Sequence, residues 1–448
     1  MLWLRPRALP ALLRRFGLRS IDSRISLFWP VTLGIVIVAA VFRLAWVEDM
    51  EYKGDESWTY LQTRIVRDGG PLPLVGMPTS QNAPNPAGSI WVFVGLSELF
   101  RPDSPTELAR IGHWMNILAI AGLLVFASVC VPADTRAAWM WAAALVAVNP
   151  LAVVLHRKIW PPSIAPILLL GVLIGWWHRD RRWGAAMWGF LGVVIGQIHL
   201  SGMFLAAGMA AWAGLFDRRG VRWWAWAVGV ACAAWPLALW LPTAVEQAAA
   251  NPTGQIRLSN FATLNFFLRW VTEPFGIVLS YSLGNDFGDF LRYPIVSGTP
   301  TYLVGGLHVA IYSLLGYFVV SMLIRAWQRR REWRQILSGS GSASLFLVNA
   351  VALGYGGLLT LSCVPIHRHY MLVTFPAMQL WVAILALSNR RPFAFGLTRG
   401  QALLLTLCLV QSAVSACFLG YVHENQRAIR GDYGMPYAAQ IRCGVTPK

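Results

Sequence analysis

Long apolar stretches recur along the whole sequence, and they constrain the fold more than any other feature of this chain. An apolar stretch of about 18 or more residues is typical of a helix that crosses a lipid bilayer. We predict eleven such helices, at residues 27–47, 108–131, 138–155, 163–178, 184–198, 201–216, 223–241, 302–324, 345–363, 371–387 and 402–421. The fold class that follows is an all-α polytopic membrane protein.

Charged residues are few and unevenly distributed. The chain is 56% hydrophobic and 13% charged, with a net charge of +17, whereas a soluble domain carries roughly 25% charged residues. With the N-terminus in the cytoplasm, the cytoplasmic segments hold 21 Lys and Arg against 5 Asp and Glu, and the outer segments hold 15 against 15 when Arg110, at the outer start of the second span, is counted with them. Positive charge gathers on the cytoplasmic side of membrane proteins. The excess therefore indicates orientation, not a nucleic-acid partner, and we expect a bacterial inner-membrane protein with its C-terminus outside.

Three outer segments are long, namely residues 48–107, 242–301 and 422–448, whereas most cytoplasmic loops are short. We therefore expect the chemistry to be on the outer face. In the first segment, apolar residues recur at helical spacing after Asp55, and Gly69-Gly70-Pro71 ends the pattern. This spacing predicts a helix lying on the membrane surface. Residues 89–100 are apolar but too short to cross, which predicts a re-entrant or interfacial segment.

Asp55 and Glu56 follow the first predicted span closely. Carboxylates at a membrane boundary, within reach of a lipid headgroup, suit general-base catalysis. Helix capping is the alternative, because acidic residues satisfy the free amides and the dipole at a helix start. Capping explains one acid, but Glu48, Asp49 and Glu51 are also acidic here. We expect Asp55 to be the catalytic base, with Glu56 in a positioning or hydrogen-bonding role.

Two outer turns carry clustered cationic residues, one between the third and fourth spans and one at the start of the tenth. Such clusters suit an anionic headgroup and the charge that develops on a leaving phosphate. Snorkelling of basic side chains to the interface is the alternative. The residues expected to bind a donor phosphate are Arg157, Lys158, Arg368, His369 and Tyr370. Further possible substrate-binding residues are Arg43, Asn82, Asn85, His156, His199 and Arg257.

The common nucleotide and hydrolase motifs are absent from the sequence: there is no Walker loop, dinucleotide fingerprint, His-Glu-x-x-His or Gly-x-Ser-x-Gly. The six cysteines lack zinc-like spacing. Because the outer face has no nucleotide supply, the energy for any synthesis there must come from an activated lipid-linked donor.

Several short motifs, all on the predicted outer side, resemble the GT-C class of integral-membrane glycosyltransferases, which includes the protein O-mannosyltransferases and the lipid A aminoarabinose transferases. The resemblance covers most of the chain to about Tyr370. The motifs are Gly54-Asp55-Glu56, Asn82-Ala83-Pro84-Asn85-Pro86 with Ser97-Glu98-Leu99-Phe100 and Ala109-Arg110, Asn149-Pro150 with His156-Arg157-Lys158-Ile159-Trp160-Pro161, Gln197-Ile198-His199, and Arg368-His369-Tyr370.

The resemblance implies a GT-C-type fold and transfer of a sugar, with inversion, from a polyprenyl-phosphate donor to a glycan, lipid or protein acceptor. It implies that Asp55 is the general base. The corresponding division of the chain is a basic cytoplasmic N-terminus (1–26), a catalytic transmembrane module (27–301), C-terminal transmembrane helices (302–421) and an outer tail (422–448). The His of the family's His-Pro-Pro turn is missing, with Asn82 or Asn85 nearest. The outer turn at residues 156–162 lacks the acidic residue that some members carry in their second outer loop, so we expect no cofactor and no divalent metal.

Two other functions remain open from the sequence. A flippase or transporter for lipid-linked glycans would need charges along a path through the spans, which hold few ionisable residues after Arg43. A non-catalytic export scaffold would not need Asp55. A disulfide between Cys363 and Cys443, both on the predicted outer side, is also left open against two free thiols.

Overall fold

Helices make up almost all of the described structure. The computed structural model describes residues 25–78, 84–250, 258–277, 279–339, 341–425 and 427–444. The α-helices are α2 (Ile25–Leu44), α3 (Gly54–Arg67), α4 (Gly88–Phe100), α5 (Pro105–Val129), α6 (Ala133–Val148), α7 (Pro150–Leu155), α8 (Ala165–Trp177), α9 (Arg182–Ile198), α10 (Ser201–Phe216), α11 (Trp223–Ala250), α12 (Leu258–Ala262), α13 (Asn265–Thr272), α14 (Leu279–Leu283), α15 (Phe287–Arg292), α16 (Leu303–Gln328), α17 (Trp333–Ser338), α18 (Ala343–Asn349), α19 (Gly356–Leu361), α20 (Ala377–Leu387), α21 (Arg399–Asn425) and α22 (Tyr437–Arg442). Two short antiparallel hairpins join β1 (Val75–Pro78) to β2 (Pro84–Pro86), and β3 (Ile295–Val296) to β4 (Thr299–Pro300).

Each of the eleven predicted spans coincides with helical structure, but the helices differ in length. Five described stretches are long and apolar enough to cross a membrane: Pro105–Val129, Trp223–Glu246, Leu303–Gln328, Ala343–Leu361 and Arg399–Asn425. A sixth is possible if the 3₁₀ helix η8 (Arg368–Thr374) and α20 form one span bent by 73°. These helices are those of a multi-pass membrane protein, and the count of eleven stays a prediction.

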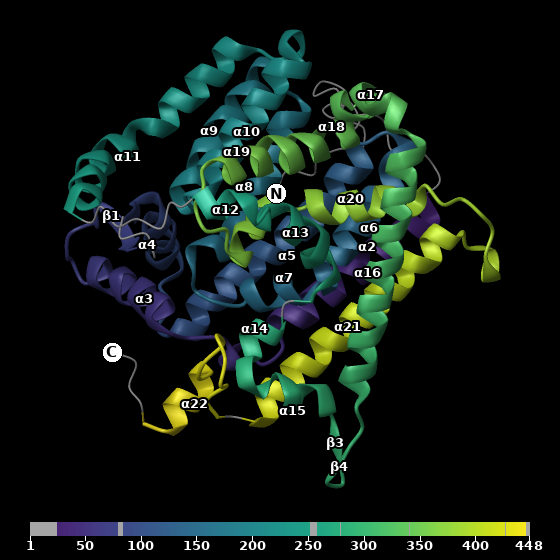
Figure 1. The fold of residues 1–448 in the computed structure, drawn as a ribbon. Helices are drawn as coiled ribbons and strands as arrows, with labels where there is room; N and C mark the ends of the chain where they lie inside the picture. The colour runs from purple at the N-terminus through teal and green to yellow at the C-terminus, as the bar shows by residue number, and fades with distance from the viewer. Residues whose placement is uncertain are drawn as a thin grey trace, which may run out of the picture.

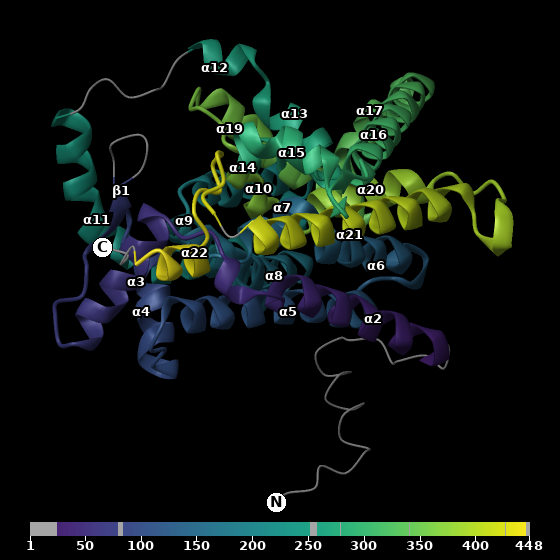
Figure 2. The same ribbon diagram turned by 90° about the horizontal axis from the view of Figure 1, so that it is seen from below.

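The helices form a bundle with the shorter outer elements at one end. Helix α6 packs against α2, α5, α20 and α21, and α9 packs against α8, α10 and α11. Figures 1 and 2 show α3, α4, β1 and α22 gathered at the end of the bundle where α2 and α21 finish and α5 begins. The first predicted outer segment and the tail therefore share one end of the molecule.

Small residues allow the closest helix contacts. A Cβ atom at Gly229 of α11 would lie 2.0 Å from the Ala186 carbonyl oxygen of α9, and one at Gly189 would lie 2.3 Å from the Trp226 carbonyl oxygen. Backbones this close exclude any larger side chain at these positions. Such contacts are typical of helix packing in membranes, where association depends on van der Waals fit.

Helix α3 confirms the helix predicted after Asp55, and its packing is inverted relative to a soluble helix. The face buried in the protein is polar and includes Glu56, Thr59 and Thr63, whereas Leu61 and Ile65 are exposed. The two threonine hydroxyls bond to backbone carbonyls one turn earlier on the same helix. The exposed apolar face agrees with a helix on a membrane surface. Residues 89–100 form α4, which packs on α3.

The tail after α21 connects two outer segments that are far apart in sequence. Tyr437 N–H donates to the Met50 carbonyl, next to an antiparallel bridge between Glu51 and Pro436. Arg430 pairs with Asp286 of the second outer segment at 2.6 Å. The tail thus fixes the end of the first span against the region of α14 and α15.

Candidate active site

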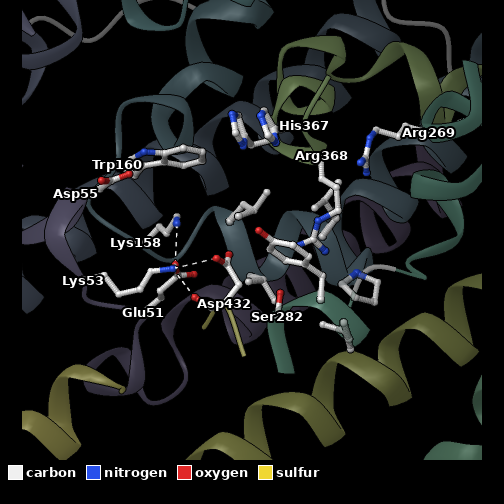
Figure 3. A pocket seen from close by; sticks show the side chains of 17 residues that line it. Glu51, Lys53, Asp55, Lys158, Trp160, Arg269, Ser282, His367, Arg368 and Asp432 are labelled. Atoms are coloured by element: carbon white, nitrogen blue, oxygen red, sulfur yellow. Dashed lines mark hydrogen bonds and ion pairs between the residues drawn. The ribbon is translucent and has the colours of Figure 1, made fainter. Parts of the chain in front are cut away.

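One cavity of about 270 Å³ lies where the outer segments meet. Its wall combines the start of α3, helix α7 with the turn after it, α13, α14, residues 367–369 at the start of η8, and the tail. The lining residues are Glu51, Lys53, Asp55, Pro150, Leu151, Val154, Leu155, Lys158, Trp160, Arg269, Leu279, Tyr281, Ser282, His367, Arg368, His369 and Asp432. Figure 3 places Asp55, Lys53 and Lys158 on one side and Arg269 and Arg368 on the other. Four of the residues predicted for catalysis or donor binding therefore meet here: Asp55, Lys158, Arg368 and His369.

Asp55 presents an exposed carboxylate to this cavity from the first turn of α3. Its backbone carbonyl accepts a bond from Thr59, but its carboxylate oxygens have no hydrogen-bond or ion-pair partner among the described residues. The positive end of the helix dipole favours a carboxylate in the first turn. An unengaged carboxylate that lines a cavity is available to accept a proton from a bound hydroxyl.

Glu56 points the other way and is fully buried. One oxygen accepts a bond from the Lys53 backbone N–H at 2.9 Å, which completes a capping box at the start of α3. The other oxygen lies 3.2 Å from the Lys158 ammonium. Glu56 therefore caps the helix and holds Lys158, and it does not line the cavity.

Lys158 is held by two buried carboxylates. Its Nζ lies 3.1 Å from Glu51 Oε1 and 3.2 Å from Glu56 Oε1, and 4.3 Å from the centroid of the Trp160 ring. Burial alone would lower the pKa of Lys158, but the two facing carboxylates raise it, so the ammonium stays charged. Its charge is balanced within the protein, and it contributes less net attraction for a donor phosphate than an unpaired lysine would.

The opposite side of the cavity carries two guanidinium groups. Arg368 lies over the Tyr281 ring, 3.9 Å from its centroid. Arg269 bonds to the Ile366 carbonyl and pairs with Glu273 at 3.2 Å. Burial raises the pKa of Glu273 to about 7, while Arg269 and Arg368 act to lower it. The charge on this side of the cavity therefore depends on the proton of Glu273 near neutral pH.

The imidazole rings of His367 and His369 and the indole ring of Trp160 close one wall. His369 makes edge contacts with Trp160 and His199, with centroids 5.0 and 5.2 Å apart, and stacks on His367 at 5.5 Å. Burial, with the nearby cations, holds the pKa of His369 well below its usual range, and burial lowers the pKa of His199 to about 4. Both imidazoles are neutral at pH 7, so His369 can offer a phosphate a hydrogen bond but not a charge. Tyr370 packs on His199 and does not line the cavity.

The tail contributes a third carboxylate to the cavity, after Glu51 and Asp55. Asp432 Oδ1 lies 3.5 Å from Lys53 Nζ, which also donates to the Asp432 carbonyl and pairs with Glu51 at 2.6 Å. Figure 3 places Asp432 between the Asp55 side and the Arg368 side. The tail therefore forms part of the cavity wall.

Arg43 was predicted as a possible substrate-binding residue, but it does not line the cavity. Its side chain is completely buried and donates to the carbonyls of Val146 and Ala147 at 3.0 and 2.8 Å. Helix α6 ends there because Pro150, which lacks an N–H, starts α7. Its last carbonyls need other donors, and Arg43 supplies them.

Arg157 also bonds to backbone carbonyls at a helix end, and not to the cavity where it was predicted to bind a donor phosphate. Its guanidinium donates to the carbonyls of Phe42 and Trp46, at 2.9 and 2.8 Å, at the end of α2. It is 2% exposed and is not part of the cavity. His156 is buried beside it, with Nδ1 3.3 Å from Arg43. The predicted donor site of Arg157 together with Arg368 is therefore not formed, because the carbonyls at the end of α2 use the Arg157 guanidinium group.

The remaining predicted residues lie away from the cavity or outside the described chain. Asn85 donates to the Met77 carbonyl and holds the β1–β2 hairpin. Asn82 and Arg257 lie outside the described residues. Cys363 and Cys443 are both free thiols, so the proposed disulfide is not formed.

Glu273 and the contribution of α14 were not identified from the sequence. For Glu273, the sequence offered one signal: it follows Arg269 by four residues, a spacing that favours an ion pair on one helix face. Tyr281 and Ser282 carried none, since their place depends on the tail packing against α14. A cluster of three or more His, Cys, Asp or Glu residues able to hold a metal ion is not found among the described residues.

No family model matches the chain, and no curated protein matches its sequence. Among solved structures, it is similar to the apo oligosaccharyltransferase of Archaeoglobus fulgidus at 14% identity and a TM-score of 0.47, over 88% of this chain and 56% of that one. It is also similar to that organism's oligosaccharyltransferase AglB in complex with an inhibitory peptide and a dolichol-phosphate, at 12% identity and a TM-score of 0.45, over 92% and 56%. A third similar structure is that of ArnT from Cupriavidus metallidurans bound to undecaprenyl phosphate. Its sequence identity is 13% and its TM-score is 0.42, over 94% of this chain and 85% of that one.

The chain thus spans 56% of the length of the archaeal enzyme. Both enzymes belong to the GT-C class that the sequence motifs resemble.

Proposed function

We propose that this protein transfers a sugar from a polyprenyl-phosphate donor to an acceptor hydroxyl at the outer face of the membrane, with inversion. The acceptor oxygen attacks the anomeric carbon from the side opposite the phosphate. A new carbon–oxygen bond forms as the bond to the phosphate oxygen breaks. Asp55 takes the acceptor proton, and the bonding electrons leave with the lipid phosphate.

The observation that carries this proposal is the separation of charge across one cavity. An unengaged carboxylate, Asp55, lies on one side, and the guanidinium groups of Arg368 and Arg269 lie on the other (Figure 3). Inverting displacement needs a base and a leaving-group site on opposite sides of the anomeric carbon. Guanidinium groups stabilise the charge that develops on phosphate oxygens, and a carboxylate within reach of the acceptor supplies general-base help.

The place of the cavity suits a lipid-linked donor. It lies at the end of the helical bundle, beside the starts of α3 and α7 and the turn before η8 (Figures 1 and 2). A prenyl chain can stay in the bilayer while its phosphate reaches Arg368. The exposed apolar face of α3 supports a cavity at the level of the lipid headgroups, because that face keeps the start of the helix at the membrane surface.

The transporter alternative finds less support. The buried cation of the first span, Arg43, is used by backbone carbonyls, so it is not available to line a path for a charged glycan. The scaffold alternative leaves the unengaged Asp55 in a polar cavity without a purpose.

Transfer of label from a panel of polyprenyl-phosphate sugars tests the function. Purified protein in lipid should release polyprenyl phosphate and label a glycan, lipid or peptide acceptor with at least one donor of the panel. Arg368→Leu should weaken donor binding, since it removes a phosphate ligand. If protein that binds polyprenyl phosphate transfers no sugar from any donor of the panel, the proposal is wrong.

A further inference from the structure

We infer that Asp432 binds the hydroxyl groups of the sugar being transferred, and that the site accepts neutral sugars and rejects uronic acids. This inference rests on the proposed function and names the class of sugar for the same cavity. It assigns a substrate contact to the C-terminal tail, which lies far in sequence from the other cavity residues.

The backbone around Asp432 is fixed from two sides. The amide of Asp432 donates to the Tyr281 carbonyl at 3.2 Å, and the amide of Tyr433 donates to the Ser282 carbonyl at 2.8 Å. The buried Tyr433 hydroxyl donates to the Asp49 carbonyl at 2.5 Å. These bonds hold the tail against α14 and against the end of the first span, so position 432 is determined by the fold and not by a loose chain end.

The side chain of Asp432 remains accessible. It is 46% exposed, and Lys53 contacts only its Oδ1, at 3.5 Å. Lys53 also donates to the Asp432 backbone carbonyl and pairs with Glu51. Lys53 therefore acts as a positioning residue for the tail, and the second carboxylate oxygen of Asp432 is left for a ligand.

The position of this carboxylate decides what it contacts. The donor phosphate lies by Arg368 and the acceptor oxygen lies by Asp55, so the sugar ring occupies the space between them. Asp432 lies in that space (Figure 3). An ionised carboxylate only accepts hydrogen bonds, and the hydroxyls of a neutral sugar are suitable donors. The carboxylate of a uronic acid would meet Asp432 as a like charge, which is unfavourable.

The test compares binding of four ligands to the full-length protein in lipid: polyprenyl phosphate without a sugar, and donors carrying a neutral hexose, its single-deoxy analogues or a uronic acid. In Asp432→Asn, affinity for the neutral donor should fall roughly 10- to 100-fold, because the sugar hydroxyl loses a charged acceptor and meets an amide N–H in place of one carboxylate oxygen. Affinity for bare polyprenyl phosphate should be unchanged, and discrimination against the uronic acid should relax. For the wild type, one deoxy donor should bind more weakly than the parent hexose donor. For the variant, that deoxy donor and the parent donor should bind almost equally, because both changes affect the same hydrogen bond.

Asp289→Asn is the matched control, since Asp289 pairs with Arg292 and Arg430 outside the cavity. Lys53→Met tests the positioning role and should weaken the neutral donor less than Asp432→Asn does. Equal loss of bare polyprenyl phosphate and neutral donor in Asp432→Asn would mean damage to the cavity and would overturn the inference. So would unchanged binding of the neutral donor. Because binding is read without turnover, failure of transfer with intact discrimination would count against the proposed function alone.

Discussion

Two buried arginines illustrate what a single residue's sequence context can and cannot predict. Arg157 and Arg43 lie in or next to the motifs that the sequence marks as functional, yet each bonds to backbone carbonyls at a helix end. The need for such donors follows from the Asn149-Pro150 break and from the end of α2, both of which are visible in the sequence. Which cation meets which carbonyl depends on contacts more than 100 residues apart, and the sequence does not encode these locally.

Arg157 and Arg368 should respond oppositely to removal of charge. Arg157→Leu leaves the Phe42 and Trp46 carbonyls without their donor, and each unsatisfied buried group costs roughly 1–3 kcal/mol. We expect a large loss of thermal stability with donor affinity per folded molecule unchanged. Arg368→Leu should instead lower donor affinity with little loss of stability. Thermal unfolding in lipid and donor binding, measured on both variants, check this. If Arg157→Leu weakens donor binding without lowering stability, Arg157 is a phosphate ligand and its assignment as a helix-end donor is wrong.

At the scale of elements, helix α3, which carries Asp55, was predictable from the sequence, whereas the elements across the cavity from it were not. The periodicity after Asp55 gave α3 with its stop at Gly69. The segment from α13 through the 3₁₀ helix η4 (Glu273–Phe275) gave no comparable signal, because its side chains reach the cavity only through packing against residues 366–369.

This α13–η4 segment should make donor binding depend on pH. The pKa of Glu273 is raised to about 7, so below neutral pH the carboxyl is protonated and Arg269 and Arg368 face the cavity without its negative charge. Affinity for a donor phosphodiester should therefore rise as pH falls through 7. If binding raises the pKa of Glu273 by one unit, the change in affinity is about tenfold.

Glu273→Gln should bind the donor tightly at both ends of the range and remove this dependence. Titration of donor affinity between about pH 6 and 8 is the measurement, because a phosphodiester does not titrate there. Asp289→Asn is the control and should keep the dependence. A pH profile identical in the wild type and in Glu273→Gln would exclude Glu273 as its source.

At the scale of the whole molecule, five segments far apart in sequence build one cavity. Lys53 and Asp432 are separated by 379 residues, and Tyr433 reaches Asp49 across 384. The distribution of charge predicted that these segments share a side of the membrane, and their convergence agrees with it. The contacts themselves arise from the packing of complete helices, which local patterns do not specify.

The predicted topology, with the N-terminus in the cytoplasm and the C-terminus outside, has a direct test in the native cysteines. Cys443 is exposed at the end of α22. In a Cys363→Ser background, a membrane-impermeant maleimide added to spheroplasts should label it, and the further change Cys443→Ser should remove that signal. A cysteine placed at Arg331, between α16 and α17, should be labelled only after the membrane is opened. The reverse pattern would invert the topology and place the cavity in the cytoplasm.

The central claim is that Asp55 accepts a proton in the transfer step while donor binding depends on other residues. The most direct measurement is the single-turnover rate of sugar transfer by Asp55→Asn, with donor affinity measured on the same preparation and Glu48→Gln as the matched carboxylate control. The account predicts a rate lower by roughly 10²–10⁴-fold, the usual contribution of general-base help, with donor affinity close to that of the wild type. A near-native transfer rate in Asp55→Asn, or an equal loss in Glu48→Gln, would contradict it.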